Sequence, residues 1–196
     1  IKGRKLLKIF GFKSEYVFYL VYLTISTLII LLWLIFPNTV LLLFLIVACY
    51  HFGKEDTVFS VEKKIFFKEF LYFLKGSSVI VAPLLFHREE TNQIFKTLNF
   101  NFFEISFFND YLLLIILFLS FLSIFFLSNK KNIDFKILMI ADFLSIIIIN
   151  FFLSPILAFT LYFCFLHSIR HSLTLIFELD KSLKNGFKKF IKKAVP

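Results

Sequence analysis

The chain has 196 residues, of which 59% are hydrophobic and 20% aromatic, and its formal net charge is +9 at pH 7. A domain of this size cannot hide that much apolar surface from water, which excludes a soluble globular protein and a disordered chain. Only two cysteines are present, which excludes a disulfide-rich secreted scaffold. The composition therefore predicts an all-α integral membrane protein in the lipid bilayer. Basic residues of such proteins collect on cytoplasmic loops, so we expect no nucleic-acid binding.

Six stretches are long and apolar enough to be transmembrane helices. In chain order they cover residues 16–36, 39–52, 70–86, 111–128, 137–153 and 156–177. Pro37, Gly53 and Pro155 mark three of their ends, because proline and glycine interrupt helices. No internal repeat is evident, and we expect a single transmembrane domain over residues 1–196.

The basic residues predict an orientation. Of the 22 Lys and Arg residues, 18 lie before the first span, after the second, after the fourth or after the sixth, which is one side of the membrane if the spans alternate. The positive-inside rule places that side, and both ends of the chain, in the cytoplasm of a cell (plasma or inner) membrane protein. The connection from Arg88 to Asp110 is expected to be an amphipathic segment along the interface or a structured loop.

Ionisable side chains inside spans are costly unless they are paired or functional. The spans contain Lys75, Asp142, Arg170, His51, His167 and His171. Lys75 is near the cytoplasmic end of its span, so we expect its ammonium group to reach the interface by snorkelling.

Three of the histidines share a depth in the membrane. His167 and His171 are spaced i, i+4, which puts both imidazoles on one helix face. Counted from the outer ends of their spans, His51, His167 and His171 lie about 20, 18 and 24 Å deep at 1.5 Å per residue. This layer predicts a metal site in the cytoplasmic half of the membrane. An all-histidine set suits iron(II), copper or zinc, and the sequence leaves that choice open.

Two further residues are placed by the same counting. Asp142 lies near the histidine layer, where it would accept a hydrogen bond from a ligand histidine or pair with Arg170, and the sequence does not choose between these. His87 falls at the outer end of its span if the helix continues past Pro83, which predicts a structural or capping role. A break at Pro83 would instead turn His87 inward.

Two motifs resemble those of a known family. The run YHFGKED from Tyr50 to Asp56 resembles the HFG-x-x-D motif of the Brp/Blh family of membrane β-carotene 15,15′-dioxygenases. The run YFCFLHSIRH from Tyr162 to His171 resembles the family's YF-x-x-x-HS-x-RH motif, and residues 83–90 are similar to a looser third segment. The resemblance implies cleavage of the central double bond of β-carotene by O₂ to two molecules of all-trans-retinal, which in microbes serve rhodopsins.

The resemblance also implies a site. The family holds Fe(II) with four histidines, three of which correspond to His51, His167 and His171. Candidates for residues that orient these ligands are Asp56, Asp142 and Arg170. Iron would leave positions open for O₂, and aromatic side chains would act as a ruler that brings the middle of the carotenoid to it.

The fourth histidine of the family belongs to an HG-x-x-D motif on a preceding helix, which this chain lacks. We therefore expect a chain that is incomplete at its N-terminus, with at least seven transmembrane helices in the complete protein. The chain as it stands is expected to insert, to bind iron weakly and to form little retinal.

Two other classes compete with the dioxygenase. Paired histidines across membrane helices also ligate haem, which would make the protein an electron-transfer subunit. A transporter or scaffold without catalysis is the third hypothesis. A Soret band in the visible spectrum would indicate haem, and an unchanged phenotype of His167→Ala would indicate the third class.

Overall fold

The computed structural model describes residues 15–57, 67–100, 109–128, 133–180 and 182–194, and within these ranges every regular element is a helix. The predicted all-α class is thus confirmed. In chain order the elements are α2 (Glu15–Ile35), α3 (Pro37–Glu55), α4 (Lys68–Phe86), α5 (Arg88–Thr97), α6 (Asp110–Leu127), α7 (Ile133–Phe152), α8 (Pro155–Leu161), η2 (Tyr162–His167), α9 (Ser168–Leu179) and α10 (Leu183–Ala194).

Six helical segments in the described residues are long and apolar enough to cross a membrane, as predicted, with α8, η2 and α9 forming the last one. Their bounds differ at some ends. Gly53 does not end the second span, because α3 continues through it to Glu55. The fifth span begins at Ile133, before the predicted start, since the Asp134 carboxylate is favourable in the first turn of a helix.

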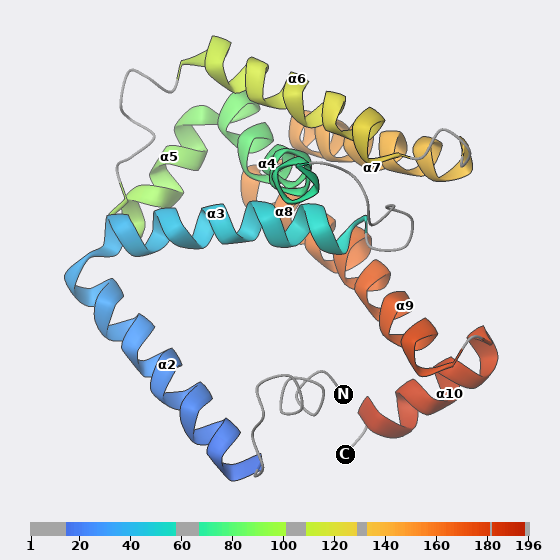
Figure 1. The fold of residues 1–196 in the computed structure, drawn as a ribbon. Helices are drawn as coiled ribbons and strands as arrows, with labels where there is room; N and C mark the ends of the chain where they lie inside the picture. The colour runs from blue at the N-terminus through green and yellow to red at the C-terminus, as the bar shows by residue number, and fades with distance from the viewer. Residues whose placement is uncertain (1–14, 58–66, 101–108, 129–132, 181, 195–196) are drawn as a thin grey trace.

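The central helix of the bundle is α4, which packs against α3 on one side and α6 on the other (Figure 1). Half of its apolar window is buried, a larger share than in any other described span. Gly53 of α3 and Gly76 of α4 allow the close approach: a Cβ on Gly53 would collide with the Tyr72 carbonyl, and a Cβ on Gly76 with the Cys49 carbonyl. Small residues at a crossing let membrane helices pack backbone to backbone. This crossing fixes the end of α3, which carries His51 and Asp56, against α4.

The close packing of α3 against α4 can be tested by placing a larger side chain between them. Gly76→Leu is expected to lower the free energy of unfolding by about 1–3 kcal/mol, because the new side chain meets rigid backbone and the two helices must move apart. Ala141→Leu introduces the same side chain on an exposed face of α7 and is the matched control. Thermal unfolding in detergent micelles measures both, and equal melting temperatures would show that the helices do not touch at Gly76.

The connection after α4 begins as a helix. The α5 segment is tied to the end of α4 and the start of α6, since Thr91 Oγ1 donates to the Pro83 carbonyl at 3.0 Å and Arg88 Nη1 pairs with Asp110 Oδ1 at 2.7 Å. The predicted amphipathic segment is thus a helix over Arg88–Thr97, while residues 101–108 lie outside the described part of the chain.

The first and the last described helices differ in their packing. The α2 helix extends away from the bundle, and no side chain in its apolar window is buried (Figure 1). The basic segment after the sixth span, for which the sequence predicted no element, forms α10 and packs against α9. There Lys189 Nζ lies 2.6 Å from Asp180 Oδ2 and Gly186 lies against the Ile176 carbonyl. That these ends lie in the cytoplasm stays a prediction.

Candidate metal centre

The three predicted ligand histidines come from two spans, the second and the sixth, that meet within the bundle. His51 lies near the end of α3, His167 ends η2, and His171 lies in the first turn of α9. The ring centroids of His51 and His167 are 5.5 Å apart, and those of His167 and His171 are 6.3 Å apart. His167 is buried, His171 is half-buried and His51 is exposed. The structure therefore brings these imidazoles together as one group.

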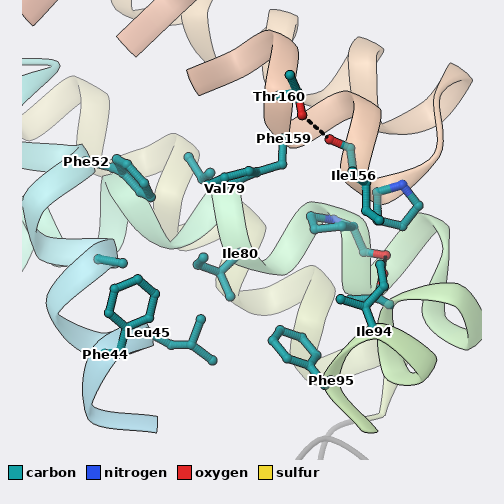
Figure 2. A pocket seen from close by; sticks show the side chains of 14 residues that line it. Phe44, Leu45, Phe52, Val79, Ile80, Ile94, Phe95, Ile156, Phe159 and Thr160 are labelled. Atoms are coloured by element: carbon teal, nitrogen blue, oxygen red, sulfur yellow. Dashed lines mark hydrogen bonds between the residues drawn. The ribbon is translucent and has the colours of Figure 1, made fainter. Parts of the chain in front are cut away.

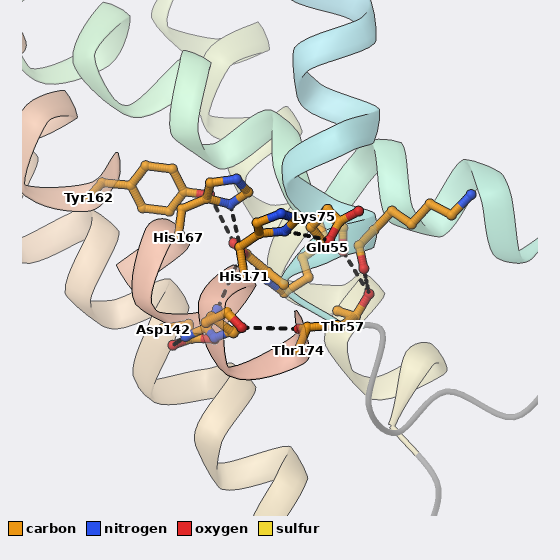
Figure 3. Close-up of polar contacts among 12 residues, drawn as sticks. Glu55, Thr57, Lys75, Asp142, Tyr162, His167, His171 and Thr174 are labelled. Atoms are coloured by element: carbon orange, nitrogen blue, oxygen red, sulfur yellow. Dashed lines mark hydrogen bonds and ion pairs between the residues drawn. The ribbon is translucent and has the colours of Figure 1, made fainter. Parts of the chain in front are cut away.

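Two carboxylates face the histidines from the end of α3. The Asp56 Oδ1 atom lies 3.2 Å from His167 Nδ1, and the Glu55 Oε2 atom lies 3.0 Å from His171 Nδ1 (Figure 3). A carboxylate only accepts hydrogen bonds, so it favours the tautomer that carries its proton on Nδ1. That tautomer leaves the Nε2 lone pair for a metal, as in the carboxylate–histidine–metal arrangement of many enzymes.

The separation of the imidazole rings limits which of them could bind one metal ion. Two imidazoles that bind one ion through nitrogen at about 2.1 Å have ring centroids no more than about 6.5 Å apart. Both measured separations meet this limit. Among the described residues, however, no three His, Cys, Asp or Glu side chains are arranged to hold an ion as they stand. The His167 and His171 planes are nearly parallel, at 14°. Imidazole and carboxylate are donors that suit a metal, and the ring separations lie within the limit, but the side chains must rearrange before they could hold an ion together.

A π-helical turn aligns two side chains on the same carboxylate. Tyr162 and His167 are the first and last residues of η2, and both bond to Asp56, the Tyr162 hydroxyl donating to Oδ2 at 2.8 Å. In an α-helix, five residues at about 100° each would leave these side chains about 140° apart. A π-helix closes its turn between residues i and i+5, so both side chains reach one side of the helix.

Buried charges around Asp56 balance one another. Lys75 Nζ lies 3.9 Å from Asp56 Oδ2 and Arg170 Nη1 lies 3.5 Å from Asp56 Oδ1, while Arg170 Nη2 donates to Asp142. Two acids and two bases thus form a neutral cluster, the usual condition for keeping charges inside a membrane protein. Burial raises the pKa of Asp56, which follows the last residue of α3, but Lys75, the His167 hydrogen bond and Arg170 outweigh it and hold the pKa at about 2.

This cluster decides two questions that the sequence posed. Asp142 pairs with Arg170, whereas Asp56 contacts His167, one of the three predicted ligands. The snorkelling prediction for Lys75 is wrong, because its side chain is only 5% exposed and its ammonium group points to Asp56 instead of the interface. The Lys75 ammonium group therefore forms an ion pair with Asp56 inside the bundle.

Sequence reasoning assigned no role to Glu55 or Tyr162. A signal for Glu55 was available, since it lies four residues after His51, and the adjacent carboxylates Glu55 and Asp56 directly follow the histidine motif. Tyr162 begins the YF-x-x-x-HS-x-RH motif, but the motif did not show that Tyr162 aligns with His167, because this alignment depends on the π-helical turn.

His87 lies away from this group. The α4 helix continues through Pro83 to Phe86, as the prediction of a capping role required, and His87 lies at the junction of α4 and α5. Along α4 that is about 18 Å from Lys75, which marks the level of the histidines.

An apolar cavity of about 260 Å³ lies beside the histidine group (Figure 2). It lies between α3, α4, α5 and α8, and Phe52 forms its wall on the side of the histidines. The Phe52 ring is edge-on to the His167 ring, with 5.0 Å between centroids. A ligand in the cavity is therefore separated from the imidazoles by one aromatic ring.

The fold and the site together define a multi-pass helical membrane protein with a histidine–carboxylate cluster beside an apolar cavity. A family model described as beta-carotene 15,15′-dioxygenase matches residues 1–196. The chain belongs to this family, which confirms the resemblance found in its two motifs. No curated protein and no solved structure matches the chain significantly.

Proposed function

We propose that the protein breaks the central 15,15′ double bond of β-carotene with O₂ and releases two molecules of all-trans-retinal. One C=C bond is broken and two C=O bonds form, so one O₂ per carotenoid balances the reaction. The observation that carries the proposal, within a chain of this family, is the apolar cavity that ends one ring away from the clustered histidines.

The proposed cofactor is Fe(II), with the Nε2 atoms of His51, His167 and His171 as its ligands. When bound, the iron supplies the redox chemistry that lets O₂ react with a polyene. Asp56 and Glu55 hold protons on the Nδ1 atoms of His167 and His171, which keeps both rings in the ligating tautomer. Asp56 remains ionised in this role because Lys75 and Arg170 lie beside it.

The aromatic residues around His167 have a separate task in this proposal. The rings of Phe52 and Phe163 lie 5.0 and 5.6 Å from the His167 ring. They exclude water from the path between the cavity and the histidines and offer flat surfaces to a conjugated hydrocarbon. Receipt of the retinal by a microbial rhodopsin stays a prediction.

The test is a reaction with the full-length protein purified in lipid vesicles and supplied with Fe(II), β-carotene and O₂. We expect retinal, measured by liquid chromatography, to form in air and not under nitrogen. A chelator should abolish its formation, and added Fe(II) should restore it. A Soret band in the purified protein would overturn the proposal in favour of haem, and carotenoid that binds but stays intact in air would favour a carrier.

A further inference from the structure

The cavity beside the histidines offers its ligand almost nothing polar. Two of its lining residues carry hydroxyl groups, and both hydroxyls are already committed: Thr91 Oγ1 donates to the Pro83 carbonyl at 3.0 Å, and Thr160 Oγ1 to the Ile156 carbonyl at 2.8 Å. The remaining lining side chains are hydrocarbon. A polar ligand would lose its hydrogen bonds with water on entering such a space, so the cavity suits a hydrocarbon.

The two ends of the cavity differ. Phe52 lies at the end next to His167, and Ile94 of α5 and Ile156 of α8 lie at the opposite end (Figure 2). Ile94, Pro155 and Ile156 also line a second depression, whose other lining residues include Glu90, Gln93 and Thr97. These three residues therefore form a wall one side chain thick between the apolar cavity and a more polar surface.

The distance along the last span from Ile156 to His167 matches half of the proposed substrate. From Ile156 to His167 the last span advances by about 15 Å, given 1.5 Å per residue and a somewhat shorter rise in the π-helical turn. Half of a C40 carotenoid, from its central bond to the far edge of its ring, is also about 15 Å long, for bonds of about 1.4 Å in a trans zigzag. A carotenoid that enters until its ring meets Ile94 and Ile156 thus has its central bond at the level of His167.

Several contacts fix the part of the wall that α5 supplies. The α5 helix, which supplies Ile94, is fixed to α4 by the Thr91 hydrogen bond and to α6 by the Arg88–Asp110 ion pair. At its far end, Phe95 packs edge-on against Phe100, with 5.5 Å between ring centroids, and Phe100 is 1% exposed.

We propose that this cavity holds one half of the carotenoid, and that Ile94 and Ile156 are the stop that selects the central double bond for cleavage. The inference rests on the proposed function and adds to it the residues that determine where the chain is cut. The sequence led us to expect aromatic side chains to position the carotenoid, whereas the proposed stop consists of two aliphatic side chains, Ile94 and Ile156.

The proposal is tested by replacing each of the two stop residues with the smaller alanine. In Ile94→Ala and in Ile156→Ala the ring can advance toward the second depression, which moves a non-central double bond to the histidines. We expect off-centre apocarotenals to appear, with their ratio to retinal raised at least about tenfold, since changes of this size in an apolar pocket alter discrimination by about 10–200-fold. Because this ratio compares two products of the same sample, it does not depend on how much of the protein is folded. The two substitutions lie on different helices, α5 and α8, so each tests the stop independently. Ile115→Ala makes the same change on an exposed face of α6 and should give retinal alone.

A second measurement detects binding without catalysis. Trp33 is the only tryptophan and packs against the buried cluster of Leu41, Leu45 and Phe100, of which Leu45 lines the cavity, so a bound polyene should quench its fluorescence. Ala48→Phe fills the cavity and should abolish the quenching by β-carotene.

The outcomes separate the two proposals. If the unsubstituted full-length protein forms no retinal, the proposed function fails. If it forms retinal while both alanine variants keep its product ratio, or if Ala48→Phe leaves the quenching intact, the stop and the cavity are wrong and the function stands.

Discussion

Asp56→Ala should lower both the stability of the protein and its affinity for iron. Without this carboxylate, Lys75 and Arg170 keep only Asp142 as a buried partner, which leaves an uncompensated positive charge. Removing one partner of a buried ion pair costs about 3–5 kcal/mol. His167 also loses the acceptor of its Nδ1 proton, and loss of such an acceptor weakens metal binding by about 10–100-fold. Thermal unfolding and the iron content of the purified protein measure the two effects.

A double variant separates charge from ligand orientation. Asp56→Ala combined with Lys75→Met removes one acid and one base, so the buried cluster is again neutral. We expect most of the lost stability to return while iron affinity stays low, because His167 still lacks its acceptor. If Lys75→Met adds no stability to Asp56→Ala, Lys75 does not balance Asp56, and the neutral-cluster argument is wrong.

Alanine at His51, His167 or His171 should reduce retinal formation by at least about 100-fold, because each variant removes a proposed ligand of the metal that supplies the oxygen chemistry. The assay is retinal extracted from β-carotene-producing cells that express the full-length variants, with the iron content of each purified protein as a second readout. Cells with an inactive variant keep the orange colour of the carotenoid.

His87→Ala is the matched control, since His87 is the remaining histidine of the chain and lies about 18 Å along α4 from the level of the site. We expect it to keep much of the activity and its full iron content. If His87→Ala is inserted and folded yet as inactive as His167→Ala, the ligand set has been assigned wrongly. If His167→Ala keeps both its iron and its activity, the metal lies elsewhere.

The amino-acid sequence by itself determined the spans and the depth of the histidines. Long apolar runs specify membrane helices whatever they pack against, since the bilayer selects them by length and hydropathy. Depth follows from the fixed rise of a helix, which is why His51, His167 and His171 could be placed in one layer, where the structure has them side by side. The i, i+4 spacing likewise placed His167 and His171 on one face.

Only the tertiary structure decided which polar groups meet within that layer. Helix rotation and crossing are set by packing, here by Gly53 and Gly76, and this packing turns Lys75 to Asp56. The π-helical turn changes the phase of the last span and aligns Tyr162 with His167, which counting at 3.6 residues per turn could not anticipate. Partners of a buried charge are chosen by distances across helices, and a periodicity along one helix holds no information about those distances.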